Sequence, residues 1–242
     1  MRALITGASR GIGRATAERL AGPEVALAVH YFRHDQEARE LAEALAGKGP
    51  PPLVLRADLG HAPDLDDLVR GLLERWDSLD VLVHNAGGYP RAKFEELTDE
   101  EFEACLRSNL VGPAHLTRRL LPALRKSGHG RIVFVSSVLA FMGSRHGAHY
   151  AAAKAGLVGL ARSLAQELAP SITVNVVAPG AIDTAILAGD TPEVRRDREA
   201  KIPLGRVGSA AEVADAIAFL ASPQASYITG AVLHVNGGWF SG

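Results

Sequence analysis

Tyr150 and Lys154 are the residues whose types and spacing suggest chemistry most directly. They stand four positions apart in Tyr-Ala-Ala-Ala-Lys, a segment of strong helix formers, so both side chains are expected on one helix face. A free phenol has a pKa of about 10, too high for efficient proton exchange at neutral pH. A neighbouring ammonium favours the phenolate and would lower that pKa. The pair therefore predicts a tuned general acid and base.

Other polar residues strengthen this hypothesis, because Tyr-x3-Lys alone occurs by chance in many helices. Ser136 and Ser137 end a predicted strand, where neighbouring residues point to opposite faces, so only one can face a site. Ser137 is the better candidate to hydrogen-bond a substrate oxygen; alternatively, both serines cap a turn. Asn109 lies within a predicted long helix, where asparagine is unfavourable. This suggests a site requirement, such as holding a water next to Lys154.

A glycine-rich turn predicts a nucleotide site. Thr6-Gly-Ala-Ser-Arg-Gly-Ile-Gly13 follows the first predicted strand and opens the first predicted helix. Gly7 permits a tight turn, Gly11 lets backbone amides approach a pyrophosphate, and Gly13 permits close packing of helix on sheet. The spacing Gly-x3-Gly-x-Gly departs from the standard dinucleotide fingerprint, so the place of the turn between strand and helix carries the argument. The cofactor contacts expected here are Gly7, Ser9, Arg10, Gly11, Ile12 and Gly13.

Charge at the end of the second predicted strand favours NADP(H) over NAD(H). A chain that binds NAD usually places a carboxylate there, whereas here Tyr31 stands at about that position. Arg10 and Arg33 can flank a 2′-phosphate with charge-assisted hydrogen bonds. Two observations oppose this: Asp35 is close by, and both arginines could be ordinary surface residues.

The ends of the third and fourth predicted strands carry further candidate contacts, since ligands bind at that edge of open parallel sheets. Asp58 is expected to accept a hydrogen bond from the adenine amino group, with Leu59 packed beside it. Asn85, Ala86 and Gly87 follow the fourth strand, where a cofactor must pass close to the backbone. Either segment could be an ordinary turn, but their regular placement favours a role in binding.

The elements that must position these residues alternate between short β-branched runs and longer helical stretches. The predicted strands are Ala3–Thr6, Val25–Val29, Leu53–Arg56, Val81–His84, Arg131–Val135, Ile172–Val177 and Val232–Val235. The predicted helices include Ile12–Ala21, Leu65–Arg75, Glu100–Leu124 and Tyr150–Leu168. The strands are nearly all apolar, as in strands covered on both faces by helices. Repeated strand–helix units predict an α/β fold with a parallel, doubly wound sheet, and Thr98 with Glu101 predicts a capping box.

Composition and charge exclude several classes of protein. The 242 residues show no internal repeat or linker, so residues 1–242 are expected to form a single domain. A net charge of -1 gives no field to recruit nucleic acid or an anionic membrane. No apolar run approaches a membrane span and no signal peptide is evident, so a cytoplasmic protein is expected. The single cysteine, Cys105, excludes an intramolecular disulfide, and no metal site is expected because His146 and His149 lack a third ligand.

One charged stretch, residues 186–205, is expected to form a short helix or a substrate flap; the alternative is a solvated surface helix. Its arginines at positions 195, 196 and 198 could meet the acidic surface or phosphopantetheine of an acyl carrier, or simply face solvent. Residues 144–149, just before Tyr150, are bulky and basic. Within them His146 or His149 could line a substrate pocket, although surface positions in a loop are the more common case for such histidines.

Taken in order along the chain, these motifs resemble the short-chain dehydrogenase/reductase family. They are Thr6-Gly-x3-Gly-x-Gly13, Asn85-Ala-Gly87, Asn109, Ser137, Tyr150-x3-Lys154, Pro179-Gly180 and the ending Asn236-Gly-Gly238. The resemblance covers essentially the whole chain. It implies a Rossmann fold with seven parallel strands and helices on both faces, and an oxidoreductase that moves a hydride between nicotinamide and a carbonyl or alcohol carbon. His84 is a departure, because the family often has asparagine there.

The resemblance also implies roles for individual residues. In a catalytic tetrad Tyr150 protonates the carbonyl oxygen, and Lys154 lowers the pKa of the phenol and binds the ribose hydroxyls of nicotinamide. Ser137 orients the carbonyl, and Asn109 anchors a water relay. The further cofactor contacts that the resemblance implies are Pro179, Gly180, Ile182 and Thr184, besides Tyr150 and Lys154.

Within this family the chain looks most like the 3-oxoacyl-[acyl-carrier-protein] reductases, which are usually homotetramers. This likeness implies an NADPH-dependent reduction of a ketone, with a small-molecule or acyl-carrier-bound substrate. Two alternatives stay open. One is a related enzyme that acts on a sugar, a polyol or another carbonyl compound. The other is a regulator that binds NADP(H) without catalysis, for which a degraded tetrad would be the mark; this tetrad is complete.

Overall fold

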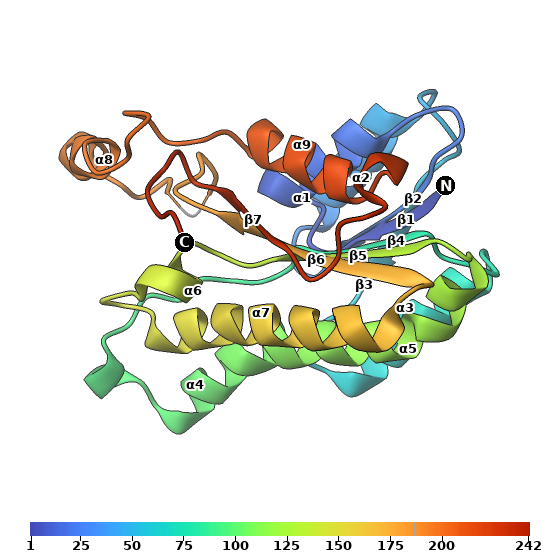
Figure 1. The fold of residues 1–242 in the computed structure, drawn as a ribbon, viewed down its shortest axis with the longest axis horizontal. Coiled ribbons are helices and arrows are strands. Elements are labelled where there is room, and N and C mark those ends of the chain that lie inside the picture. Colours follow the sequence, from blue (N-terminus) through green and yellow to red (C-terminus); the bar gives the residue numbers. More distant parts are fainter. Residues whose placement is uncertain (186) are drawn as a thin grey trace.

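A seven-stranded parallel sheet forms the middle layer of the computed structural model, which describes residues 1–185 and 187–242 (Figure 1). The strands are β1 (Arg2–Ile5), β2 (Ala26–Tyr31), β3 (Leu53–Arg56), β4 (Val81–His84), β5 (Gly130–Val135), β6 (Ile172–Pro179) and β7 (Val232–Val235). Their order is β3-β2-β1-β4-β5-β6-β7. The chain thus winds outward in both directions from the β1–β4 pair, the point where ligands bind in such sheets. The prediction of a doubly wound, seven-stranded parallel sheet is confirmed.

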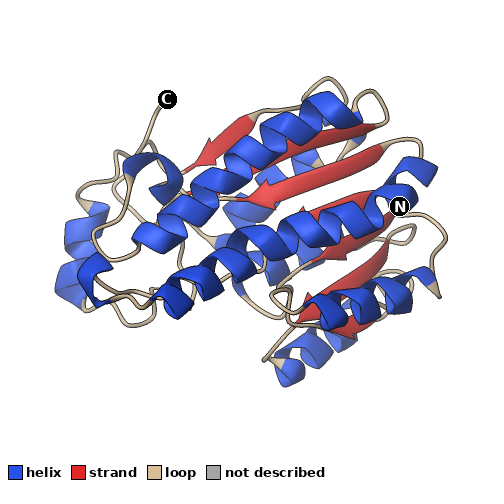
Figure 2. Ribbon diagram, turned by 90° about the horizontal axis from the view of Figure 1, so that it is seen from below, coloured by secondary structure: helices blue, strands red, loops and turns tan. Residues whose placement is uncertain are grey.

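Helices cover both faces of this sheet (Figures 1 and 2). One layer contains α1 (Gly11–Leu20), α2 (Asp35–Leu45) and α9 (Ala210–Leu220). The other contains α3 (Ala62–Leu73), α5 (Gly112–Lys126) and α7 (Ala148–Leu168). Three further helices, α4 (Asp99–Leu106), α6 (Leu139–Met142) and α8 (Pro192–Glu199), lie toward one end of the molecule. Short 3-10 turns lie at Phe94–Glu96 and Pro223–Ala225, and a π-helical turn lies at Arg107–Val111.

The apolar character of the strands explains the two layers, because alternate residues of one strand enter different cores. Leu82 of β4 is buried with the side chains of α3, α5 and α7, whereas its neighbour Val83 is buried with those of α1, α2 and α9. On β5, Phe134 and Val133 divide in the same way. Full burial of a leucine-sized side chain contributes about 1.5–3 kcal/mol. A strand with an apolar residue at every position is therefore stable only between two helical layers.

The predicted helix Glu100–Leu124 is wrong in one respect, since a π-helical turn at Arg107–Val111 separates α4 from α5. Its beginning is as expected: Thr98 and Glu101 form the predicted capping box. The break coincides with close packing, because a Cβ on Gly112 would lie 2.3 Å from the carbonyl oxygen of Leu59. A wider π turn shifts the register of the helix at this position.

The charged stretch at 186–205 contains α8, which begins after Thr191 as its N-cap. Ile186, the first residue of the expected flap, lies outside the described residues. A short helix is therefore confirmed for part of this stretch. No helix of the described chain is long and apolar enough to cross a membrane.

Candidate active site

A cleft of about 500 Å³ opens beyond the C-terminal ends of β4, β5 and β6. Many residues proposed from the sequence line it, although they come from widely separated segments. These are Ile12, Asn85, Gly87, Ser137, Tyr150, Lys154, Pro179, Gly180, Ile182 and Thr184. The fold thus brings the glycine turn, the Tyr-x3-Lys helix and the Pro-Gly segment to a single cavity. The parallel sheet explains this, because its strands all end at the same edge.

Tyr150 lies in the first turn of α7 and is only partly exposed. Its ring packs against that of Tyr89, with 4.7 Å between centroids. Burial raises the pKa of the Tyr150 phenol to about 12, and a hydrogen bond with Ser137 opposes this rise. At neutral pH the phenol therefore keeps its proton, which is the state that a proton donor needs.

Lys154 lies one turn further along the same helix face and is buried. Its ammonium nitrogen donates a hydrogen bond to the carbonyl oxygen of Val135 at 2.9 Å and lies 5.6 Å from the centroid of the Tyr150 ring. Burial lowers the pKa of Lys154 to about 8. That Lys154 lowers the pKa of the phenol stays a prediction, and in the chain by itself the net shift of that pKa is upward. Desolvation by burial disfavours the charged form of each group and is the largest cause of both shifts.

The two serines at the end of β5 point in different directions, as the strand pattern predicts. Ser136 is buried and donates a hydrogen bond from its hydroxyl to the carbonyl oxygen of Lys154 at 2.8 Å, which ties β5 to α7. Ser137 instead makes the hydrogen bond with Tyr150 and also accepts one from the backbone N–H of Leu139 at 3.2 Å. Ser137 is therefore the serine that faces the phenol.

Asn109 occupies the π turn between α4 and α5 and is buried. Its amide nitrogen donates to the carbonyl oxygens of Cys105 at 3.1 Å and Gly88 at 3.2 Å. Its amide oxygen has no hydrogen-bond partner within the described chain. A Cβ placed on Gly87 would lie 2.3 Å from this oxygen and 3.4 Å from the Lys154 nitrogen. Gly87 thus separates two buried polar groups, and no larger residue fits there.

The glycine turn has the backbone that its sequence predicts. Gly7 and Gly11 adopt φ values of 64° and 57°, which disfavour any residue with a Cβ. The packing partner predicted for Gly13 needs a correction, because its close neighbours are the turn and Asn85 rather than the strands of the sheet. A Cβ there would meet the Gly7 carbonyl oxygen at 2.3 Å and the Asn85 amide nitrogen at 2.5 Å. Asn85 in turn donates to the carbonyl oxygens of Thr6 and Gly7, each at 3.0 Å, so Gly13 packs against the turn and its support.

His30 is a second support of the turn, and sequence reasoning missed it. It is buried in β2, and its Nδ1 accepts a hydrogen bond from the Gly7 backbone N–H at 3.1 Å. Its Nε2 lies 3.0 Å from the carbonyl oxygen of Ala57 and donates to it, because Nδ1 is already the acceptor. Burial lowers the pKa of His30 to about 4, which keeps the ring neutral and Nδ1 able to accept.

The residues proposed to choose between NADP(H) and NAD(H) lie around the end of β2. Tyr31 is buried and donates its hydroxyl proton to Asp35, which also accepts a hydrogen bond from Arg39 at 2.7 Å. The Asp35 carboxylate is thus already engaged by α2. Arg10 and Arg33 are exposed, and the guanidinium of Arg33 stacks over Phe32 at 5.3 Å. The Tyr31 hydroxyl therefore holds the Asp35 carboxylate in place and is already engaged.

Several proposed contacts do not line the cleft. Asp58 uses its carboxylate to accept a hydrogen bond from the Gly60 N–H at 2.8 Å, as in a turn. The side chain of Leu59 is buried in the core with α3 and α5, so it packs away from any adenine. The other site residues proposed from the sequence that do not line the cleft are Gly7, Ser9, Arg10, Gly11, Gly13, Tyr31, Arg33, Ala86 and Asn109.

The wall opposite the sheet comes from two loops that sequence reasoning did not connect. The Tyr89 hydroxyl lies 2.7 Å from that of Ser144, and the Ala92 N–H donates to the carbonyl oxygen of His146 at 3.1 Å. A Cβ on Gly147 would lie only 2.4 Å from the Tyr89 ring. His146 lines the cleft as proposed, whereas His149 is buried, which excludes a surface position for it.

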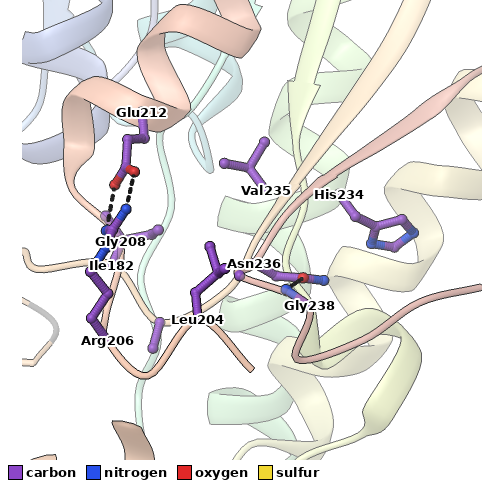
Figure 3. Close-up of a pocket in the computed structure, with 11 residues that line it drawn as sticks. Ile182, Leu204, Arg206, Gly208, Glu212, His234, Val235, Asn236 and Gly238 are labelled. Carbon is purple, nitrogen blue, oxygen red and sulfur yellow. Dashed lines mark hydrogen bonds and ion pairs between the residues drawn. The ribbon is translucent and has the colours of Figure 1, made fainter. Parts of the chain in front are cut away.

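A second cavity of about 190 Å³ lies beside the cleft (Figure 3). Its main polar feature is a pair of contacts between Arg206 and Glu212, at 2.6 and 3.1 Å. The Arg206 guanidinium lowers the pKa of Glu212 to about 2, so the pair stays charged. None of the four tetrad residues lines this cavity. The pair ties the segment before α9 to that helix, and the larger cleft is the candidate site.

Comparison with known proteins agrees with this geometry. A family model described as enoyl-(acyl carrier protein) reductase matches residues 7–240. The 3-oxoacyl-[acyl-carrier-protein] reductase of Escherichia coli is 40% identical over 98% of this chain and 96% of its own length. The corresponding Staphylococcus aureus reductase is 36% identical over 98% of this chain and 97% of its own.

A solved structure resembles the whole chain. It is a Brucella melitensis short-chain dehydrogenase/reductase titled glucose/ribitol dehydrogenase, which is 33% identical to this chain. It matches with a TM-score of 0.90, covering 100% of this chain and 97% of the other. The fold and the sequence thus place the chain among the same group of oxidoreductases.

Proposed function

Because this chain belongs to the short-chain dehydrogenase/reductase family, we propose that it reduces a ketone to a secondary alcohol with NADPH, using Tyr150 as the proton donor. One observation carries the proposal. The Tyr150 phenol lies in the cleft with a pKa of about 12 and a hydrogen bond to Ser137. A phenol that keeps its proton at neutral pH suits reduction, in which the carbonyl oxygen must gain a proton.

The chain's own residues divide the work around the carbonyl oxygen. Ser137 holds that oxygen by a hydrogen bond, and Tyr150 donates its proton to it as negative charge develops there. The Lys154 ammonium stabilises the resulting phenolate, since a charge forms beside it that the resting phenol does not carry. The unpartnered oxygen of Asn109 accepts a hydrogen bond from a water that returns a proton toward Lys154.

The residues around the glycine turn fit a dinucleotide. The turn offers backbone N–H groups at the N-terminus of α1, where an anion is stabilised, and glycine is required at Gly7 and Gly11 by their φ values. We assign the pyrophosphate to this turn and the nicotinamide end to Pro179, Gly180, Ile182 and Thr184. When bound, the nicotinamide supplies the hydride.

NADP(H) is the cofactor we propose, on grounds of charge. Asp35, a carboxylate close to the end of β2, is occupied by Tyr31 and Arg39. Arg10 and Arg33 are exposed nearby and can accompany a 2′-phosphate. Arg33→Ala should therefore weaken NADPH binding at least about 10-fold more than NADH binding. Arg125→Ala, which removes an exposed arginine from the end of α5, is the control; equal weakening of both cofactors by Arg33→Ala would refute the charge argument.

We propose a 3-oxoacyl thioester as the substrate class, because the relatives in Escherichia coli and Staphylococcus aureus are named for that reaction. The Brucella melitensis structure is titled for glucose and ribitol, so a sugar or polyol is the second candidate. NADPH consumption with acetoacetyl thioesters, sugar ketones and quinones distinguishes them. Turnover of the thioester supports the first candidate, and turnover of sugar ketones alone supports the second. No turnover of any carbonyl compound, despite NADPH binding, would support a non-catalytic regulator.

We also propose a cytoplasmic homotetramer, which is what the likeness to acyl-carrier-protein reductases implies. An acyl carrier protein is then the partner that presents the substrate. Light scattering on the purified chain measures the assembly, and a monomer at micromolar concentration would contradict it. Activity with an acyl-carrier-bound ketone, compared with the free thioester, tests the partner.

A further inference from the structure

The cleft is lined by several cationic side chains. Of the described residues that line it, Arg91, Arg145 and Arg198 are arginines, and none is aspartate or glutamate. Lys154, which is buried, is engaged with the backbone of β5. The three arginines have no part in the chemistry proposed above. Cations gathered in a cleft with low-dielectric walls create a local field that concentrates anions.

Two of these arginines are held in place by one buried carboxylate. Asp190 has a side chain that is 5% exposed, and it pairs with Arg198 at 2.7 Å and with Arg91 at 3.8 Å. Two guanidinium groups on a single carboxylate leave one positive charge in excess. Both guanidinium groups pair with this one buried carboxylate. Asp190 therefore restricts the orientation of the Arg91 and Arg198 side chains.

Arg145 differs from the other two, because it is exposed and has no ion-pair partner in the part of the chain that the structure describes. It belongs to the loop that Ser144 ties to Tyr89 at 2.7 Å. Its charge therefore adds to the excess, and the loop that carries it is anchored to the cleft wall.

Arg91 lies close to the proposed proton donor. The guanidinium carbon of Arg91 is 5.5 Å from the centroid of the Tyr89 ring, which is 4.7 Å from the centroid of Tyr150. Together these distances limit the separation between Arg91 and the Tyr150 ring to about 10 Å. An anion on a chain of several bonds from the ketone carbon spans a distance of this order, and the anion of a short keto acid spans only part of it. The positive charge is thus within reach of the substrate itself.

We propose that Arg91, Arg145 and Arg198 bind an anionic group of the ketone substrate, so that the enzyme prefers anionic ketones to neutral ketones of the same skeleton. This inference rests on the proposed ketone reduction and adds the charge of the substrate to it. A carboxylate on a short keto acid and a phosphate on a longer thioester arm share the required chemistry. Guanidinium groups bind both through paired, charge-assisted hydrogen bonds.

The test compares matched pairs of substrates with the full-length enzyme and NADPH. One pair is acetoacetate and its neutral methyl ester; the other is acetoacetyl-coenzyme A and the neutral acetoacetyl-N-acetylcysteamine. The expected result is a kcat/KM at least about 10-fold higher for the anionic member of one pair. A preference for acetoacetate assigns the arginines to a carboxylate, and a preference for the coenzyme A thioester alone assigns them to a phosphate.

Arg145→Gln is the first variant, because no ion pair of Arg145 would be lost among residues 1–185 and 187–242. Arg91→Gln/Arg145→Gln is the second. The preference should fall about 10-fold, while neutral ketones and the KM for NADPH change less than about 2-fold. Arg75→Gln, the control, removes an exposed arginine between α3 and β4. It should change neither the preference for anionic ketones nor the kinetics with neutral ketones and NADPH.

Equal kcat/KM within both pairs would overturn the inference, and so would a preference for anionic ketones that survives in both variants. In either case, turnover of the neutral ketones would still support the proposed ketone reduction. Absence of turnover for all four ketones would contradict the proposed function instead.

Discussion

The buried histidine at the end of β4 gives a stability prediction that can be worked out in numbers. His84 is fully enclosed, stacks on Phe134 at 4.8 Å and lies 2.7 Å from the hydroxyl of Thr117. Burial lowers its pKa to about 3, whereas an unfolded histidine has a pKa of about 6.5. Because the folded value is the lower one, the stabilisation is complete above about pH 6.5 and is lost as the pH falls toward 3.

At pH 5 the unfolded chain binds nearly one proton at this position and the folded chain binds almost none. This difference in proton binding lowers the free energy of unfolding by about 2 kcal/mol between pH 7 and pH 5. His30, with a folded pKa of about 4, adds a cost of about the same size. The wild-type chain should therefore lose about 4 kcal/mol between pH 7 and pH 5 from these two groups.

His84→Asn removes one of the two titrations and keeps a polar group near Thr117. Urea unfolding of the cofactor-free protein at a fixed concentration, at pH 7 and at pH 5, should show a loss about 2 kcal/mol smaller than in the wild type. The absolute stability of the variant can fall at both pH values, so only the difference is compared. His115→Asn, at an exposed position of α5, should behave as the wild type. Equal losses in wild type and His84→Asn would refute the assignment.

Two further predictions concern the supports of the site. His30→Leu leaves the Gly7 N–H and the Ala57 carbonyl without their partner, so unfolding free energy should fall by about 1–3 kcal/mol for each group. NADPH binding, followed by fluorescence titration, should weaken at the same time, and unchanged affinity would show that His30 does not position the turn. Gly147→Ala would place a Cβ 2.4 Å from the Tyr89 ring and should raise the KM for ketone at least about 10-fold, because that ring must leave the cleft wall. An unchanged KM would mean that the wall does not contact substrate.

The fold was predictable from the sequence because its strands are apolar at nearly every position. Only a sheet covered on both faces buries both sides of such strands, and long helical segments between them require parallel pairing. The π turn at Arg107–Val111 contains Asn109, a residue that the sequence already marks as unfavourable within a helix. Its exact form depends on the contact between Gly112 and Leu59, which lie far apart in the chain and carry no shared periodic signal.

The candidate site was partly predictable for a similar reason. Strand ends and helical spacing placed Ser137, Tyr150 and Lys154 at one edge, since these are local regularities. The ionisation of Tyr150 was not predictable, because the pKa of a phenol depends on the depth of burial, which the spacing of Tyr and Lys does not contain. The arginine cluster of the cleft depends on Asp190, which meets Arg91 only in the folded chain.

Replacement of the phenol by a phenyl ring tests the proposed proton transfer most directly. Tyr150→Phe keeps the ring that packs against Tyr89 and removes the hydroxyl that carries the transferable proton. The rate of NADPH consumption at saturating ketone and saturating NADPH should fall at least about 100-fold. Tyr227→Phe, at a fully exposed tyrosine, should keep the wild-type rate. A Tyr150→Phe enzyme that works at close to the wild-type rate would contradict the assignment of Tyr150 as the proton donor.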